Sequence, residues 1–197
     1  MRRAVFLDRD DTIIRNADLP EAAWGRGTPG DLLDPDHVRL LPGASRACRT
    51  LRDAGYLIVL FTSQGGVARG GGSLQDVERT NDRLRRLLSD TPESRDLFPA
   101  DAVFDAAYFC PMHPLGSVER FSRETEWRKP APGMIAAAAA ELGIDLARSW
   151  AVGDKTRDID AGVASGIPSE QCILVGVDGD APDLATAARR ILVGAGR

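Results

Sequence analysis

Five short and unbroken apolar runs are the feature that most restricts the fold of this chain. They cover residues 4–7, 57–61, 106–109, 150–152 and 172–175. A strand that is covered on both faces is apolar at every position, whereas a half-exposed strand alternates apolar and polar residues. The runs therefore predict the strands of a central parallel sheet.

Helical patterns separate and follow these runs, over residues 43–55, 73–89, 132–142, 157–165 and 181–193. In the first pattern, Ala47, Cys48 and Leu51 share one face and Gly55 is a stop signal. In the second pattern, Ser73 is a suitable N-cap. Strands that alternate with helices predict a three-layer, doubly wound α/β fold with a mainly parallel sheet. Residues 13–40 are too short for a separate cap domain, and we expect them to form a loop.

Length and composition predict one domain over residues 1–197, because 43% hydrophobic residues fill one core and no change of composition divides the chain. No apolar run reaches the ~20 residues of a membrane helix, and the N-terminal residues do not resemble a secretion signal. Three widely spaced cysteines fit reduced thiols.

A net charge of −4 gives no reason to expect a nucleic acid partner. We expect a cytoplasmic monomer that binds neither membranes nor nucleic acid.

Polar residues follow three of the predicted strands. They are Asp8, Asp10, Asp11 and Thr12 after the first strand, residues 62–66 after the second, and residues 153–155 after the fourth. Open α/β sheets bind their ligands at the carboxyl ends of the strands. The chemistry of this chain should therefore converge at that edge of the sheet.

The acidic residues in this group suit phosphoryl transfer. Asp8 and Asp10 are two residues apart, so both side chains face the same side of a regular strand. Close carboxylates repel each other unless a cation or a proton lies between them. With Asp154 as a third acid, these hard oxygen ligands favour Mg²⁺ over zinc. One carboxylate can attack phosphorus while its neighbour works as general acid and base, although the pair alone also fits two surface aspartates.

Hydroxyl and cationic side chains supply possible anion ligands. Thr62 and Ser63, followed by two glycines, offer hydroxyl and backbone donors, although an ordinary turn has the same composition. Arg128 and Lys129 bring two cations just before a proline, or form a solvated basic pair. Lys155 follows Asp154, and its alternative partner is Asp158 or Asp160 at a helix start.

Together, these segments resemble the four motifs of the haloacid dehalogenase (HAD) superfamily of phosphatases. FLDRDDT is similar to the first motif, LFTSQGGVARG to the second, RKP to the third and VGDKTRDIDAG to the fourth. Their order and spacing match over nearly the whole chain. Within the superfamily, the sequence is most similar to the heptose 1,7-bisphosphate phosphatases, and next to the histidinol-phosphate phosphatases.

The resemblance implies a role for each matched residue. Asp8 would be the nucleophile and Asp10 the general acid and base. Mg²⁺ would be held by Asp8, by the backbone carbonyl of Asp10 and by Asp154. The transferring phosphoryl group would be held by Thr62 and Lys129, the substrate would be recognised by Arg128, and Lys155 would line the site.

The implied activity is Mg²⁺-dependent hydrolysis of a small phosphorylated metabolite through an aspartyl phosphate, with a sugar bisphosphate as the first candidate. The alternatives are a histidinol-phosphate phosphatase, a nucleic-acid end phosphatase and a noncatalytic phosphate-binding module. Two departures bear on the substrate site. Asp11 replaces a glycine of the family and adds negative charge, and Ser63 replaces an asparagine that we expect to contact substrate.

The loop before RKP departs furthest from the family. In the relatives it carries zinc on Cys-x-His followed by Cys-x-Cys. Here Cys110 remains, but Met112 occupies the histidine position, and the two later cysteines are replaced by Thr125 and Trp127. His113 lies one place too late. Because a structural zinc site needs a closed set of four ligands, we expect no zinc and a loop held by packing around Phe121 and Trp127.

Overall fold

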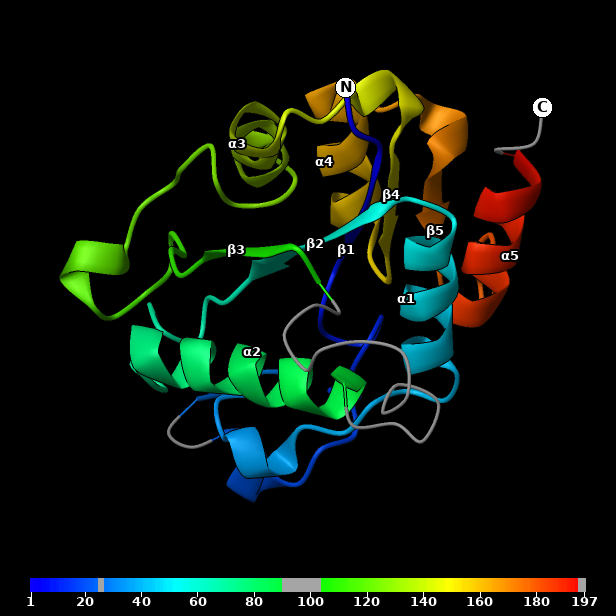
Figure 1. Ribbon diagram of the computed structural model, residues 1–197. Coiled ribbons are helices and arrows are strands. Elements are labelled where there is room, and N and C mark those ends of the chain that lie inside the picture. Colours follow the sequence, from blue (N-terminus) through cyan, green and yellow to red (C-terminus); the bar gives the residue numbers. More distant parts are fainter. Residues whose placement is uncertain (25–26, 90–103, 195–197) are drawn as a thin grey trace.

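The central sheet of this computed structural model, which describes residues 1–24, 27–89 and 104–194, has five parallel strands in the order β3-β2-β1-β4-β5 (Figure 1). The predicted runs form these strands, with ends that differ by at most two residues. The strands are β1 (Ala4–Leu7), β2 (Leu57–Ser63), β3 (Ala106–Cys110), β4 (Trp150–Gly153) and β5 (Cys172–Leu174).

The predicted helical patterns form α1 (Ala44–Asp53), α2 (Leu74–Ser89), α3 (Gly133–Leu142), α4 (Thr156–Ser165) and α5 (Leu184–Gly194). The largest difference from prediction is the start of α5. It begins at Leu184 because the carboxylate of Asp183 accepts the backbone N–H of Thr186 at 2.7 Å, which satisfies a donor of the first turn. Short 3₁₀ helices span Glu21–Trp24, Pro35–His37, Glu119–Phe121, Leu146–Arg148 and Ser169–Gln171.

Both faces of the sheet are covered, which explains why its strands are apolar throughout. Val5 and Leu7 pack into one cluster with residues of α1, α5 and the end of α2. Ala4 and Phe6 point the other way and pack with residues of α3 and α4. The three-layer fold is therefore confirmed, and neighbouring residues of one strand lie in different cores.

The strand order determines where the sheet can form a ligand-binding crevice. The chain moves outward from β1 through β2 to β3, then returns to the other side of β1 for β4 and β5. Parallel sheets of this kind form a crevice where the order reverses, beside β1 and β4. The backbone N–H of Asp8 donates to Val152 at 2.9 Å, so the residue after β1 continues the pairing with β4.

Residues 13–24 and 27–40 pack on the body of the protein and carry two short 3₁₀ helices instead of a cap domain. Ile13, Ile14, Leu32 and Val38 from this segment are fully buried in the core on the α1 side. Within the described ranges, no helix has both the length and the apolar character needed to cross a membrane.

Candidate active site

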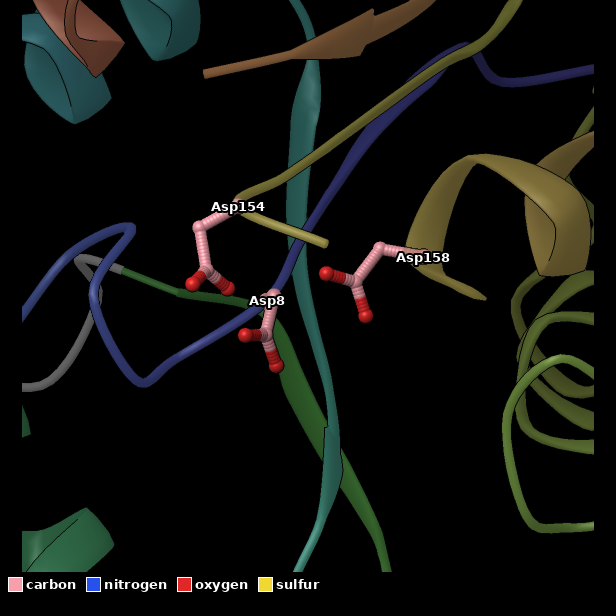
Figure 2. Close-up of side chains that lie close together, drawn as sticks. All are labelled: Asp8, Asp154 and Asp158. Atoms are coloured by element: carbon pink, nitrogen blue, oxygen red, sulfur yellow. The ribbon is translucent and has the colours of Figure 1, made fainter. Parts of the chain in front are cut away.

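Three aspartates converge at the switch point of the sheet. Asp8 follows β1, Asp154 follows β4, and Asp158 lies in the first turn of α4 (Figure 2). One carboxylate oxygen from each lies within 4.8 Å of the others, and no other described residues form such a group. The sequence indicated Asp8 and Asp154, but it suggested Asp158 only as a possible partner of Lys155. The third acid of the cluster was therefore missed.

Lys129 joins two of these acids. Its Nζ lies 2.7 Å from Asp8 Oδ1 and 2.6 Å from Asp158 Oδ1, and it donates to the carbonyl of Phe61 at 3.1 Å. The side chain is 1% exposed. Burial favours loss of the proton, but the two carboxylates outweigh burial and raise the pKa of Lys129. The ammonium therefore stays charged inside the protein.

Asp158 links this ion pair to the start of α4. Its Oδ2 accepts the backbone N–H of Lys155 at 2.9 Å. Gly153 makes room for it, because a Cβ at that position would lie 2.3 Å from Asp158 Cβ. Burial and the charge of Asp8 raise the pKa of Asp158, against the opposing effect of Lys129. Lys155 places its ammonium 2.6 Å from Asp154 Oδ2, so its pairing with Asp158 is through the backbone alone.

Asp10 lies in a different set of contacts. Its carboxylate oxygens lie 3.1 and 3.2 Å from the guanidinium of Arg9, which is fully buried. Gln64 donates to Asp10 Oδ2 at 2.8 Å, and the Thr62 hydroxyl lies 3.4 Å from the same oxygen. Burial raises the pKa of Asp10, and the charge of Asp8 adds to the shift while Arg9 opposes it. Asp10 therefore holds a proton more readily than an ordinary aspartate.

Arg9 was missed as a site residue because it reads as the variable position between two aspartates. Its Nη1 donates to Asn81 Oδ1 in α2 at 3.1 Å. The guanidinium is thus fixed between the loop after β1 and a helix far along the chain. Its position fixes the direction in which the Asp10 carboxylate points.

A cavity of about 400 Å³ opens beside the three aspartates. The predicted site residues that line it are Asp8, Asp10, Ser63, Arg128, Asp154 and Lys155. Thr62 and Lys129 are buried behind its wall. Ser63 Oγ is buried and has no hydrogen-bond partner among the described residues. The structure therefore brings every predicted site residue to one place.

Residues outside the predicted catalytic and phosphate-binding set complete the cavity wall, and of these only Arg157 lies outside the segments from which the sequence predicts substrate contacts. They are Asp11, Asn16, Ala17, Pro29, Gly30, Asp31, Gly65, Arg69, His113 and Arg157. Arg69 forms an ion pair with the buried Asp31. Burial lowers the pKa of Arg128, and the nearby charges of Arg157 and Arg69 lower it further. Positive charges thus lie close together in this part of the cavity wall.

The loop before Arg128 is held by packing, as predicted, but through only one of the two expected rings. Phe121 is 8% exposed and packs with Val67, Ala68 and Val77. Trp127 is 40% exposed, and its ring contacts Tyr108 at a centroid distance of 6.3 Å. The expectation for Trp127 was wrong because its ring lies over the sheet edge at Tyr108 instead of inside the loop.

The side chains of Cys110 and His113 both contact backbone groups within this loop. The Cys110 thiol is buried and lies 3.9 Å from the carbonyl of Met112. His113 Nδ1 accepts the backbone N–H of Leu115 at 3.1 Å. In addition, Ser117 and Val118 both donate their backbone N–H to Ala68. These bonds fix the loop to the turn after β2.

The acids fit a divalent cation, with Asp8 and Asp154 as the suitable side-chain ligands. Lys129 contacts only Oδ1 of Asp8, and Lys155 contacts only Oδ2 of Asp154. Each carboxylate thus keeps one oxygen that no described residue engages. Asp158 has both oxygens engaged, by Lys129 and by a backbone N–H. Hard oxygen donors of this number suit Mg²⁺, which keeps several waters or phosphate oxygens in its shell.

Sheet order, aspartates at the ends of β1 and β4, and a buried lysine together define a phosphoryl-transfer site of the HAD type. A family model described as HAD-hydrolase-like matches residues 126–192. A D-glycero-beta-D-manno-heptose-1,7-bisphosphate 7-phosphatase of Yersinia pestis is 37% identical over 173 residues, which are 88% of this chain and 81% of that protein. A D-glycero-alpha-D-manno-heptose-1,7-bisphosphate 7-phosphatase of Burkholderia mallei is 33% identical over 96% of this chain and 88% of its own length.

Solved structures agree with this result. The D,D-heptose 1,7-bisphosphate phosphatase of B. bronchiseptica, complexed with magnesium and phosphate, superposes with a TM-score of 0.72 at 28% identity, over 98% of this chain and 99% of that one. A putative HAD-like phosphatase of Mesorhizobium loti gives a TM-score of 0.76 at 27% identity, over 98% and 86% of the two chains. The chain belongs to the HAD-like hydrolases and, within them, to the family of the heptose bisphosphate phosphatases.

Proposed function

We propose that this protein is a Mg²⁺-dependent phosphatase that hydrolyses a sugar bisphosphate, with D-glycero-D-manno-heptose 1,7-bisphosphate as the first candidate. The observation that carries the proposal is the free oxygen of Asp8, held beside Asp154 on one side and near the proton-holding Asp10 on the other. The names of the relatives in Yersinia pestis and Burkholderia mallei support the choice of substrate.

Asp8 is the nucleophile in this proposal. Lys129 holds Oδ1 at 2.7 Å, which leaves Oδ2 to attack phosphorus. A bond forms between Asp8 Oδ2 and phosphorus as the bond from phosphorus to the sugar oxygen breaks. Mg²⁺ would be held by Asp8, Asp154 and the backbone carbonyl of Asp10, and it would supply positive charge that offsets the repulsion between carboxylate and phosphate.

Asp10 gives its proton to the departing sugar oxygen. Its raised pKa keeps that proton available, and Gln64 and Arg9 keep the carboxylate in place. In the second half of the reaction the Asp10 carboxylate takes a proton from water, whose oxygen attacks phosphorus. The Asp8 carboxylate is released and inorganic phosphate forms.

Lys129, Thr62 and Ser63 hold the transferring phosphoryl group. The three N–H groups of Lys129 are already used by Asp8, Asp158 and the carbonyl of Phe61. Contact with a phosphoryl oxygen therefore requires Lys129 to exchange one of these bonds. The charge of the nucleophile passes to the phosphoryl group during attack, so the bond to Asp8 is the one that weakens.

The second phosphate of the substrate binds at the part of the cavity wall that carries Arg128 and Arg157. Burial and the nearby charge of Arg157 lower the pKa of Arg128, and a phosphate between the two arginines would offset their repulsion. This favours a bisphosphate over histidinol phosphate, whose amine is cationic. It also gives no role to a nucleic-acid chain, and the net charge of the protein is negative.

A panel of phosphate esters tests the proposal. Phosphate release is measured with Mg²⁺ for both anomers of the heptose bisphosphate, for histidinol phosphate and for a phosphorylated DNA end. We expect the heptose bisphosphates to have the highest kcat/KM. Release of phosphate from none of these compounds would leave only the noncatalytic binding module.

A further inference from the structure

The imidazole ring of His113 lines the cavity and offers it a hydrogen-bond donor that the protein itself does not use. The ring is partly buried and belongs to the loop before Arg128. Its Nδ1 accepts the backbone N–H of Leu115 at 3.1 Å, and no described residue forms a hydrogen bond with Nε2. Nε2 is not among the buried side-chain atoms that lack a partner, so it remains accessible. A molecule in the cavity can therefore reach this nitrogen.

The contact at Nδ1 determines which nitrogen of the ring carries the proton. A backbone N–H can only donate, so Nδ1 is unprotonated. In the neutral ring the N–H group is then on Nε2. Burial, followed by the charges of Arg128 and Arg69, lowers the pKa of His113, so the ring is uncharged near neutral pH. His113 thus adds a donor to the cavity wall without adding to the positive charge of the two arginines.

A second free donor lies close to the ring. Arg69 uses Nε and Nη2 for its ion pair with Asp31, and no described residue accepts a hydrogen bond from its Nη1. Both side chains pack against Gly65, where a Cβ would lie 3.0 Å from His113 Cδ2 and 3.1 Å from Arg69 Nη1. Because Cδ2 is bonded to Nε2 within the ring, the two free N–H groups lie on the same part of the cavity wall.

Arg128 connects this part of the wall with the proposed place of the second phosphate. Its Nη1 donates to the carbonyl of Met112, the neighbour of His113 in the chain, at 3.3 Å. Asp31 also lines the cavity, but Arg69 engages both of its carboxylate oxygens. His113, Arg69 and Arg128 therefore present N–H groups beside an acid that is already paired, which is an arrangement that suits an anion.

We propose that His113 Nε2 donates a hydrogen bond to the second phosphate of the substrate, the one that is not transferred, beside Arg69 and Arg128. This rests on the proposed function, because it assumes a bisphosphate in the cavity. A hydrogen bond from an imidazole N–H to a charged phosphate oxygen is stronger than one between neutral groups. His113 then favours a bisphosphate over an ester that carries only the phosphate to be removed.

A purely structural role of His113 can be separated from this contact. Nδ1 holds the turn over residues 113–116, in which Gly116 also donates its backbone N–H to the carbonyl of His113 at 3.0 Å. His113→Asn places an amide oxygen near the position of Nδ1, where it can accept the same backbone N–H, and has no group at the position of Nε2. His113→Gln brings an amide N–H to the position of Nε2 and leaves the turn without its acceptor. One variant therefore keeps the turn, and the other keeps the donor.

The test compares kcat/KM for D-glycero-D-manno-heptose 1,7-bisphosphate and for the corresponding 7-phosphate. The relatives are named 7-phosphatases, so the 7-phosphate ester is the substrate without the second phosphate. We expect the wild type to prefer the bisphosphate, and His113→Asn to reduce that preference by about tenfold or more, chiefly through a higher KM. His113→Gln should keep more of the preference than His113→Asn. His37→Asn is the matched control, because His37 is the other histidine of the chain and does not line the cavity, and it should keep the whole preference.

Three results would overturn the assignment of His113. They are an unchanged preference in His113→Asn, an equal fall of kcat/KM for both esters, and a lower preference in His113→Gln than in His113→Asn, which would point to the turn. If the wild type hydrolysed both esters equally well, the second phosphate would have no binding place, and this inference would fail while the phosphatase activity stood. If the wild type hydrolysed neither ester, the proposed function would fail, and the inference with it.

Discussion

Lys129 and Asp158 form a buried ion pair, with Nζ 2.6 Å from Oδ1 and both side chains 1% exposed. The pair connects the loop before α3 with the first turn of α4. Removing one partner from a buried pair leaves an unpaired charge, which costs about 3–5 kcal/mol. Because Lys129 also contacts Asp8, the pair places the ammonium beside the proposed nucleophile.

Asp158→Asn tests this placement, and Asp160→Asn is its matched control because Asp160 is exposed on the same helix. We expect Asp158→Asn to lower the free energy of unfolding by about 3 kcal/mol, at the low end because Asp8 still pairs with Lys129. The kcat/KM should fall about 10–100-fold as Lys129 loses its support. Urea unfolding and phosphate release measure the two effects. Equal behaviour of the two variants would contradict a special role for Asp158.

Asp8→Asn removes the nucleophile and leaves a side chain of the same shape. We expect no measurable turnover of the heptose bisphosphate, because an amide does not form the acyl phosphate. Circular dichroism should show a folded protein. Hydrolysis at the wild-type rate by this variant would exclude Asp8 as the nucleophile.

The pH dependence of Mg²⁺ binding follows from Asp154. Burial raises the pKa of this carboxyl to about 6, and the charge of Asp8 adds to the shift while Lys155 opposes it. The folded pKa lies above its ordinary value, so the metal-free protein loses stability as pH rises from 3.8 to about 6, because the carboxyl must lose its proton in a buried place. Mg²⁺ binding requires that charged form.

We therefore expect Mg²⁺ affinity in the absence of substrate to be constant above pH 7 and to fall about tenfold per pH unit well below the pKa. Calorimetric titrations from pH 5 to pH 8 measure it. Asp154→Asn should bind Mg²⁺ weakly at every pH. Equal affinity of the wild type at pH 5 and pH 7 would remove Asp154 from the ligand set.

The fold could be predicted because its signals are local. β1 and nearly all of β2 are buried on both faces, so each is an apolar run, and polar residues follow β1, β2 and β4. Asp8 and Asp154 follow adjacent parallel strands, and strand direction alone brings them together. These relations depend on sequence pattern and on the general handedness of α/β folds.

The missed site residues depend on contacts between distant segments. Asp158 is a site residue because the first turn of α4 faces Lys129, which no spacing in the sequence reveals. Arg9 is a site residue because Asn81 of α2 holds its guanidinium against Asp10, and this contact joins segments far apart in the sequence. For Trp127 the sequence predicted burial where the structure shows exposure, because a large apolar ring usually indicates burial.

Zinc content tests the loop before Arg128. We expect protein purified without chelators to contain little zinc, because Cys110 is the one ligand that remains at the family's four positions. Elemental analysis measures the metal content. The Met112→His variant restores a second ligand and still lacks the two cysteines, so it should also contain little zinc. One zinc ion per chain in the wild type would refute this reading of the loop.

Lys129 separates a phosphatase from a protein that only binds phosphate. Its ammonium is paired with Asp8 before reaction, and in the proposed mechanism it moves to the phosphoryl group as negative charge shifts there. Lys129→Ala should lower kcat/KM by about two to three powers of ten, in line with the loss of one preorganised charged donor. Lys129→Arg should restore only part of this loss, because a planar guanidinium does not fit the place of a compact ammonium between two carboxylates.

Lys155→Ala is the comparison for general loss of positive charge, since Lys155 is exposed at the cavity and should matter less. Initial rates for folded variants, checked by urea unfolding, decide the question. Nearly full activity in Lys129→Ala would mean that the pair with Asp158 serves folding alone, and that positive charge for phosphoryl transfer comes from elsewhere in the site.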